Sequence, residues 1–204
     1  MIRQNKKLLV EGKDDAIVIN RLIRSHSVTD NFSIEEKNGI ENLLRSLPVH
    51  IKESGLNCLG IVVDADMDVS VRWGQISKIL VDSGYNPPTT PDSAGLILSE
   101  LNRPKVGIWL MPDNNTCGML EDFVKLLIPK DDYLFPIAKE AVFKIPVEYN
   151  KFREHHKSKA EIHTWLAWQE DPGTPMGLAL TKRYLDSKSL HALTFLGWIS
   201  RLFG

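Results

Sequence analysis

The fold is decided by one stretch of the chain, Leu59-Gly60-Ile61-Val62-Val63-Asp64-Ala65-Asp66-Met67-Asp68. Its first five residues are mostly apolar and β-branched, which predicts a strand buried on both faces of a sheet. Three carboxylates follow at alternate positions. Because residues two apart in an extended chain lie on the same side, Asp64 and Asp66 can converge on one cation if the backbone turns there. We therefore expect a site for a hard divalent cation at the end of this strand. The alternative is that these acids cap the next helix.

Another acid occupies the same kind of position near the start of the chain. The apolar run Leu8-Leu9-Val10 predicts a strand that stops at Glu11, and Gly12 predicts a tight turn into a helix that begins near Asp14. A weak strand at 32–35 and a helix at 40–47 precede the central strand. The order β-α-β-α-β predicts a parallel sheet with right-handed crossovers, so Glu11 and Asp64 both end strands at the same edge.

The rest of the chain divides in two at about residue 130. Apolar runs at 95–99 and 105–111 are too close together for a helical crossover, so they predict a hairpin that adds antiparallel strands to the sheet. Glu121 and Asp122 start the next helix, either to complement its dipole or to help bind metal. Residues 131–204 have helical periodicity only. We expect an α/β domain at 1–130, with a helical extension at 131–204 packed on it and its tryptophans turned inward.

Composition limits the function classes. The chain has 204 residues and a net charge of −1, so no overall basic field attracts nucleic acid, and a polyanion has to be met by a local patch. The densest basic cluster lies at 151–159. On a helix its adjacent His155 and His156 face different directions, which argues against a shared metal. The two cysteines lack a metal-binding spacing, and no apolar run is long enough to span a bilayer. We therefore expect a cytoplasmic protein that does not lie in the membrane. Homo-oligomerisation is left open.

The two acidic motifs together resemble the toprim domain of topoisomerases, bacterial primases, recombination-mediator proteins, small ribosomal-RNA maturases and OLD-type nucleases. That domain has a hydrophobic-Glu-Gly motif after its first strand and Asp-x-Asp after its third, as the segments 8–15 and 61–66 have here. The wider pattern, with 109–114, 118–122 and 165–168, resembles a toprim-like family to which no activity is assigned. The chain departs from the better-known members because it has no zinc ribbon, no strand-passage domains and no ATPase module.

The toprim resemblance implies metal-dependent phosphoryl transfer, with phosphodiester cleavage of nucleic acid as the first expectation. It implies that Glu11 is a general acid/base or a metal ligand, and that Asp64 and Asp66 bind Mg²⁺ or Mn²⁺. Asp68 and Glu121 are further candidate ligands. The candidates for contacts with the phosphates of a nucleic acid or nucleotide are Lys13, Lys157 and Lys159.

Two other classes remain open. The chain also resembles haloacid-dehalogenase-like phosphatases, in which Asp64 would be the nucleophile, Asp66 the acid/base and Asp113 a magnesium ligand. Those enzymes usually have Thr or Val where this chain has Asp68, and they carry the motif on an earlier strand. The other class is a non-catalytic toprim-like module that keeps the acids to bind or regulate. An Asp-x-Asp sugar transferase fits less well, because it gives Glu11 no role.

Overall fold

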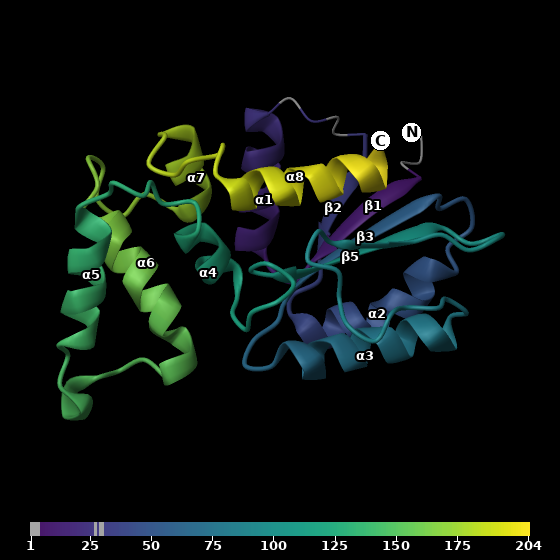
Figure 1. Ribbon diagram of the computed structural model, residues 1–204, viewed down its shortest axis with the longest axis horizontal. Helices are drawn as coiled ribbons and strands as arrows, with labels where there is room; N and C mark the ends of the chain where they lie inside the picture. Colours follow the sequence, from purple (N-terminus) through teal and green to yellow (C-terminus); the bar gives the residue numbers. More distant parts are fainter. Residues whose placement is uncertain (1–4, 27, 29–30) are drawn as a thin grey trace.

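The computed structural model describes residues 5–26, 28 and 31–204 of the chain. Its elements form three layers, with a sheet between α1 and α8 on one side and α2 and α3 on the other (Figure 1). The mainly parallel α/β fold with flanking helices that the sequence predicts is confirmed. The helices before residue 130 are α1 (Lys13–Ser25), α2 (Ile40–Ile51), α3 (Val69–Asp82) and α4 (Leu120–Lys125).

The sheet has the strand order β2-β1-β3-β5-β4, so the run that decides the fold is its central strand. All neighbouring strands are parallel except at one edge, where β4 is antiparallel to β5. The predicted hairpin is present, but only its first arm runs against the sheet, because β5 pairs with β3 in parallel. The strands are β1 (Lys6–Val10), β2 (Ser33–Glu36), β3 (Cys58–Asp64), β4 (Leu96–Leu98) and β5 (Lys105–Met111).

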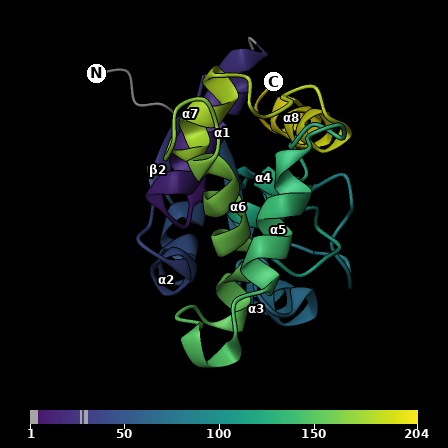
Figure 2. The same cartoon turned by 90° about the vertical axis from the view of Figure 1, so that its left-hand side faces the viewer.

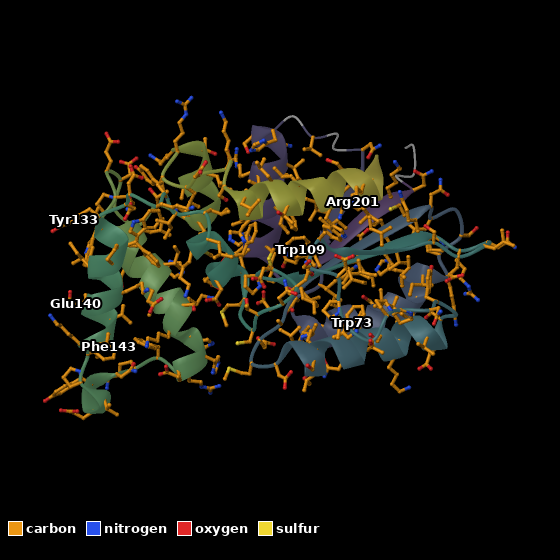
Figure 3. The ribbon with its side chains drawn as sticks, in the orientation of Figure 1. Trp73, Trp109, Tyr133, Glu140, Phe143 and Arg201 are labelled. Atoms are coloured by element: carbon orange, nitrogen blue, oxygen red, sulfur yellow. The ribbon has the colours of Figure 1, made fainter. Side chains whose placement is uncertain are left out.

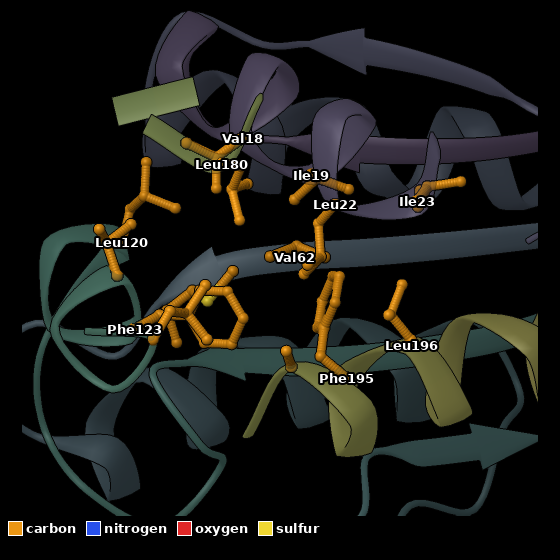
Figure 4. Packing of buried hydrophobic residues seen from close by; sticks show 14 of the residues in the cluster. Val18, Ile19, Leu22, Ile23, Val62, Leu120, Phe123, Leu180, Phe195 and Leu196 are labelled. Carbon is orange, nitrogen blue, oxygen red and sulfur yellow. The ribbon is translucent and has the colours of Figure 1, made fainter. Parts of the chain in front are cut away.

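The central strand joins two hydrophobic cores. Every residue of β3 before Asp64 is buried. Ile61 belongs to the core under α2 and α3, whereas Val62 points to the opposite face and belongs to the core under α1 and α8. Figure 4 shows Val62 in one cluster with Leu22 of α1 and Phe195 of α8. Burial on both faces explains the unbroken apolar run, and the acids begin where the strand leaves the core.

Beyond residue 131 the described chain is wholly helical, as predicted. Helices α5 and α6 lie side by side at one end of the molecule (Figures 1 and 2). None of the described helices is both long and apolar enough to cross a lipid bilayer. The elements are α5 (Leu134–Phe143), the 3₁₀ turns η1 (Val147–Tyr149) and η2 (Glu154–His156), α6 (Lys157–Ala167), α7 (Met176–Thr181) and α8 (Leu190–Phe203).

The last helix returns to the sheet. Gly60 of β3 and Gly107 of β5 are register partners, and they leave room for Leu202 and Phe203 at the end of α8. A Cβ atom on Gly60 would lie 2.9 Å from the Phe203 ring, and one on Gly107 would collide with Leu202. The glycines therefore let α8 approach the sheet closely.

The division into parts at 1–130 and 131–204 stays a prediction, since α8 covers the same sheet face as α1.

The tryptophans of the helical part follow the sequence prediction with one exception. Trp165 and Trp198 are fully buried, and Trp198 lies 5.7 Å, centroid to centroid, from Trp109. Figure 3 shows Trp109 in the interior between α8 and the sheet. Trp168, in contrast, is 41% exposed, so the prediction that it turns inward is wrong. It follows the last residue of α6, where the helical periodicity on which the prediction rests has ended.

Candidate active site

The two acidic motifs meet at the carboxyl ends of neighbouring strands. Glu11 follows β1 and Asp64 ends β3, and these two strands pair in parallel. The backbone N–H of Asp64 donates a hydrogen bond to Glu11 Oε1 over 2.8 Å. Asp64 Oδ1 in turn accepts a hydrogen bond from the backbone N–H of Leu120 at the start of α4, over 2.9 Å. The Asp64 carboxylate is thus held between the sheet edge and α4.

Asp66 is brought to the same place by a sharp turn of the backbone. Its φ is 56°, in the left-handed region, and its N–H and carbonyl each make a 2.8 Å hydrogen bond with Gly118. Its carboxylate forms an ion pair with the guanidinium of Arg72. Arg72 also donates to the Asp64 carbonyl over 2.8 Å and is only 8% exposed. The turn after β3 that the sequence requires is therefore fixed from α3 and from the 118–120 segment.

Two more buried acids, Asp15 and Glu121, complete the cluster. Asp15 Oδ2 accepts a hydrogen bond from the N–H of Gly12, whereas Asp15 Oδ1 is buried and has no hydrogen-bond donor among the described residues. Glu121 is 4% exposed, and its Oε1 lies 3.1 Å from Lys159 Nζ. The sequence singled out Glu121 as a candidate ligand but not Asp15, whose position in the first turn of a predicted helix is also typical of a helix cap.

These side chains surround a cavity of about 530 Å³, which we call the acid cavity. Glu11 lies directly behind its wall, hydrogen-bonded to Asp64. The expected convergence of Glu11, Asp64 and Asp66 at one edge of the sheet is therefore present. The cavity is lined by Gly12, Lys13, Asp14, Asp15, Asp64, Asp66, Met119, Leu120, Glu121, His155, His156 and Lys159.

Electrostatics favour protons or cations in this cluster. Burial raises the pKa of Glu11 to about 7, and Asp15 and Asp66 add to the shift against the Asp64 N–H and Arg72, which lower it. Burial likewise raises the pKa of Asp15 to about 6. The pKa of Asp64 lies well above its usual value because of burial and four neighbouring carboxyls. Burial lowers the pKa of Lys159, but nearby carboxylates, Glu121 first, outweigh it and leave that pKa raised.

The donor atoms fit a hard divalent cation. They are carboxylate oxygens, which Mg²⁺ and Mn²⁺ prefer, and the unpartnered Asp15 Oδ1 is a buried oxygen without a hydrogen bond. The residues that would hold the ion are Asp15, Asp64, Asp66 and Glu121. Within the part of the chain that the structure describes, no three Asp, Glu, His or Cys side chains already form a ligand set. Binding of a cation would therefore require these carboxylates to move closer together.

Asp68 and Lys157 are placed elsewhere. Asp68 is the N-cap of α3, where its Oδ1 accepts from Ser70 N over 2.7 Å and from Val71 N over 3.2 Å. It does not line the acid cavity, so the structure gives it the capping role that the sequence left as the alternative. Lys157 Nζ lies over the Phe143 ring, 5.7 Å from its centroid, and outside the acid cavity. Lys13 and Lys159 do line that cavity.

Two histidines line the acid cavity although the sequence assigned them no role. His155 and His156 lie in the 3₁₀ turn η2, and their ring centroids are 4.1 Å apart. The expectation that they face different directions assumed an α-helix, whereas in this 3₁₀ turn both residues line the same cavity. Their place within the basic cluster at 151–159 was the signal that could have marked them. They give the cavity a second wall of groups able to contact a phosphate.

Comparison with known proteins identifies a family but no activity. A search of curated proteins and a search of solved structures found no match. A family model described as "Protein of unknown function (DUF3226)" matches residues 5–204, which include every element that the structure describes. The chain therefore belongs to the DUF3226 family.

Proposed function

We propose that this protein catalyses metal-dependent phosphoryl transfer and that the bond it cleaves is a phosphodiester of nucleic acid. The observation that carries the proposal is the Glu11–Asp64 hydrogen bond, which joins the two acidic motifs beside the acid cavity. Acids at the carboxyl ends of adjacent parallel strands lie where open α/β sheets bind their ligands. The toprim resemblance of the two motifs agrees with this reading.

Each group at the site has a role in this reaction. When bound, Mg²⁺ or Mn²⁺ would polarise a phosphate oxygen and offset the charge that develops on it. Asp15, Asp64, Asp66 and Glu121 are the residues that would hold it. Glu11, whose pKa lies near 7, is matched to accept a proton from the attacking water or to return one to the leaving oxygen.

Basic groups around the cavity supply the contacts to a phosphate. Lys13 and Lys159 line the acid cavity together with His155 and His156. Lys159 already pairs with Glu121, so an incoming phosphate would take over part of that interaction. These four side chains form a local basic patch, which can bind a phosphate although the chain as a whole has no net positive charge. The free cysteines, Cys58 and Cys117, agree with the cytoplasmic location that we propose.

The phosphatase alternative has less support. Its nucleophile would be Asp64, whose Oδ1 accepts a hydrogen bond from Leu120 N. Its acid/base would be Asp66, which is ion-paired with Arg72. It also leaves Glu11 without a role. Trapping with beryllofluoride separates the two mechanisms, because only the phosphatase forms an aspartyl-phosphate mimic on Asp64.

The decisive experiment measures cleavage and metal binding in the same preparations. Labelled single-stranded and double-stranded DNA and RNA are incubated with Mg²⁺ or Mn²⁺, and thermal melts with and without the ion give its binding independently of activity. We expect metal-dependent cleavage by the unchanged protein, and its loss by about 10²-fold or more in Glu11→Gln and Asp64→Asn.

Asp68→Asn is the matched control. Asn caps a helix about as well as Asp, so this variant removes one nearby charge without removing the cap. It should keep both cleavage and the metal-induced shift in melting temperature. Cleavage that survives unchanged in Glu11→Gln and Asp64→Asn would refute the proposal. A metal response without turnover would favour the non-catalytic module.

A further inference from the structure

A second cavity adjoins the acid cavity. It has a volume of about 520 Å³, and Met67, Cys117 and Met119 give it a lining rich in sulfur, so we call it the sulfur cavity. Asp66, Met119 and His155 line both cavities. The two cavities therefore adjoin, with these three residues between them, and we call the pair the cleft.

The sulfur cavity is unsuited to a second phosphate. Its one lysine, Lys157, lies 4.0 Å from Glu154 and over the ring of Phe143. The Asp122 carboxylate at its edge accepts hydrogen bonds from Met119 N over 3.0 Å and from the Ser158 hydroxyl over 2.5 Å. Its cation is paired and its acids repel anions, so an uncharged group is the better occupant.

The chemistry of the lining favours a flat aromatic ring. Thioethers are polarisable and make favourable contacts with ring edges. Met67 lines the sulfur cavity and is 73% exposed, so its side chain is accessible to a ligand. The imidazole of His155, on the shared wall, offers a surface on which a base can stack.

We propose that the sulfur cavity binds the nucleobase of the nucleotide whose phosphate lies in the acid cavity. This inference rests on the proposed function and narrows its substrate. A base in the sulfur cavity cannot at the same time be stacked in a duplex. The substrate class is therefore an unpaired nucleotide, either in a single strand or at a frayed end.

Cys117 provides a native reporter of this cavity. It is exposed and lines the sulfur cavity, whereas Cys58 is buried. Burial also raises the pKa of the Cys58 thiol to about 11, so that thiol stays protonated and unreactive at neutral pH. The rate of alkylation by iodoacetamide then measures access to Cys117, and Cys117→Ser should abolish the signal.

The test compares three probes in the presence of Mg²⁺: adenosine monophosphate, ribose 5-phosphate and adenosine. We expect adenosine monophosphate to half-protect Cys117 at a concentration about tenfold or more below that of ribose 5-phosphate, since one stacked base contributes about 1–3 kcal/mol. Adenosine should also protect Cys117, and should do so without Mg²⁺. Equal protection by adenosine monophosphate and ribose 5-phosphate would overturn the inference, as would no protection by any probe.

Met67→Ala tests the lining itself. It should raise the half-protecting concentration of adenosine monophosphate by about two- to tenfold, the range of a sulfur–aromatic contact. Leu101→Ala is the matched control, because Leu101 is 88% exposed and lies outside the cleft. An unchanged half-protecting concentration in Met67→Ala would count against the assignment.

The inference and the proposed function fail in different ways. If adenosine protects Cys117 but the protein neither responds to Mg²⁺ nor cleaves nucleic acid, phosphoryl transfer is refuted and the aromatic site stands. If metal-dependent cleavage occurs and no probe with a base protects Cys117 better than ribose 5-phosphate, the aromatic site is refuted and the function stands.

Discussion

Asp64 N and Glu11 Oε1 lie 2.8 Å apart, so the ends of the first and third strands are joined by a hydrogen bond to a side chain. That contact lowers the pKa of Glu11, yet burial outweighs it and leaves the pKa at about 7. The site therefore holds an acid that exchanges its proton near neutral pH. The consequences for stability and metal binding can be measured.

The metal-free protein should lose stability as pH rises from about 5 to 8. The folded pKa of Glu11, about 7, and that of Asp15, about 6, exceed their unfolded values of 4.5 and 3.8. In this window the folded state binds more protons than the unfolded state, so the free energy of unfolding falls with rising pH. For Glu11 the loss should be on the order of 2 kcal/mol. Urea unfolding at pH 5, 6, 7 and 8 measures it.

Two changes should flatten this pH dependence. Glu11→Gln keeps an oxygen for the Asp64 N–H but cannot ionise, so it should be more stable than the unchanged protein at pH 8 and similar at pH 5. Saturating Mg²⁺ should stabilise the unchanged protein most at pH 8, where the carboxyls are ionised. A protein that gains stability between pH 5 and pH 8 without metal would contradict the acid cluster described above.

Asp66→Asn should weaken the response to Mg²⁺ and slightly destabilise the metal-free protein. Removal of one charge from an acid cluster would by itself stabilise it. The ion pair with Arg72 acts in the opposite direction, because the variant leaves that buried guanidinium without its charged partner. Asp66 is about half exposed, so the net loss should be only about 0.5–1 kcal/mol.

Asp82→Asn is the control for the Asp66 variant. It removes an acid from the exposed ion pair with Lys78 on α3, away from the acid cavity. Because the pair is fully exposed, its loss should leave stability nearly unchanged, and the metal-induced shift should equal that of the unchanged protein. Equal shifts in Asp66→Asn and Asp82→Asn would remove Asp66 from the metal site.

Gly60→Ala and Gly107→Ala should each destabilise the protein by about 1–3 kcal/mol, the usual cost of overpacking a core. The methyl group on Gly107 would meet Leu202 at the end of α8, whereas the one on Gly60 would meet Leu8 of β1 first and then Phe203, so Gly107→Ala is the more direct test of α8. Gly74→Ala in α3 is the control, since nothing lies within 4 Å of its added Cβ, and it should be neutral or stabilising by up to about 1 kcal/mol. Thermal and urea unfolding compare the three, and a similar effect at all three sites would contradict the close approach of α8.

Asp68→Ala should cost about 1 kcal/mol because the N-cap of α3 loses its acceptor, whereas Asp68→Asn should cost little. Neither substitution should change the shift in melting temperature that Mg²⁺ produces. A smaller Mg²⁺-induced shift in melting temperature in both variants would indicate that Asp68 is a metal ligand after all.

The features that depend on local sequence pattern could be predicted from the sequence. The apolar run at 59–63 fixed the central strand, and the positions of Glu11 and Asp64 after strands brought them to one edge. The local pattern could not supply contacts made by distant segments. Asp15 and Glu121 line the same cavity although they come from α1 and α4, which are far apart in the sequence. His155 joins through a 3₁₀ turn whose geometry depends on the packing of α6.

The local sequence pattern likewise could not predict which strand β5 pairs with. The run at 105–111 predicts a strand, but whether it runs with or against the sheet depends on its pairing with β3, where Lys105 is the partner of Cys58, a residue distant in the sequence. Trp168 shows the corresponding limit for burial, since it has an apolar neighbour pattern but lies just past the end of α6.

The position of α8 has a consequence for how the chain is made. Translation delivers β1, β3 and β5 well before it delivers the helix that packs on Gly60 and Gly107. Until α8 leaves the ribosome, part of that sheet face has no apolar cover, and a nascent chain in this condition is a natural client for a chaperone. The sheet face at Gly60 and Gly107 can therefore be fully covered only after α8 has been synthesised.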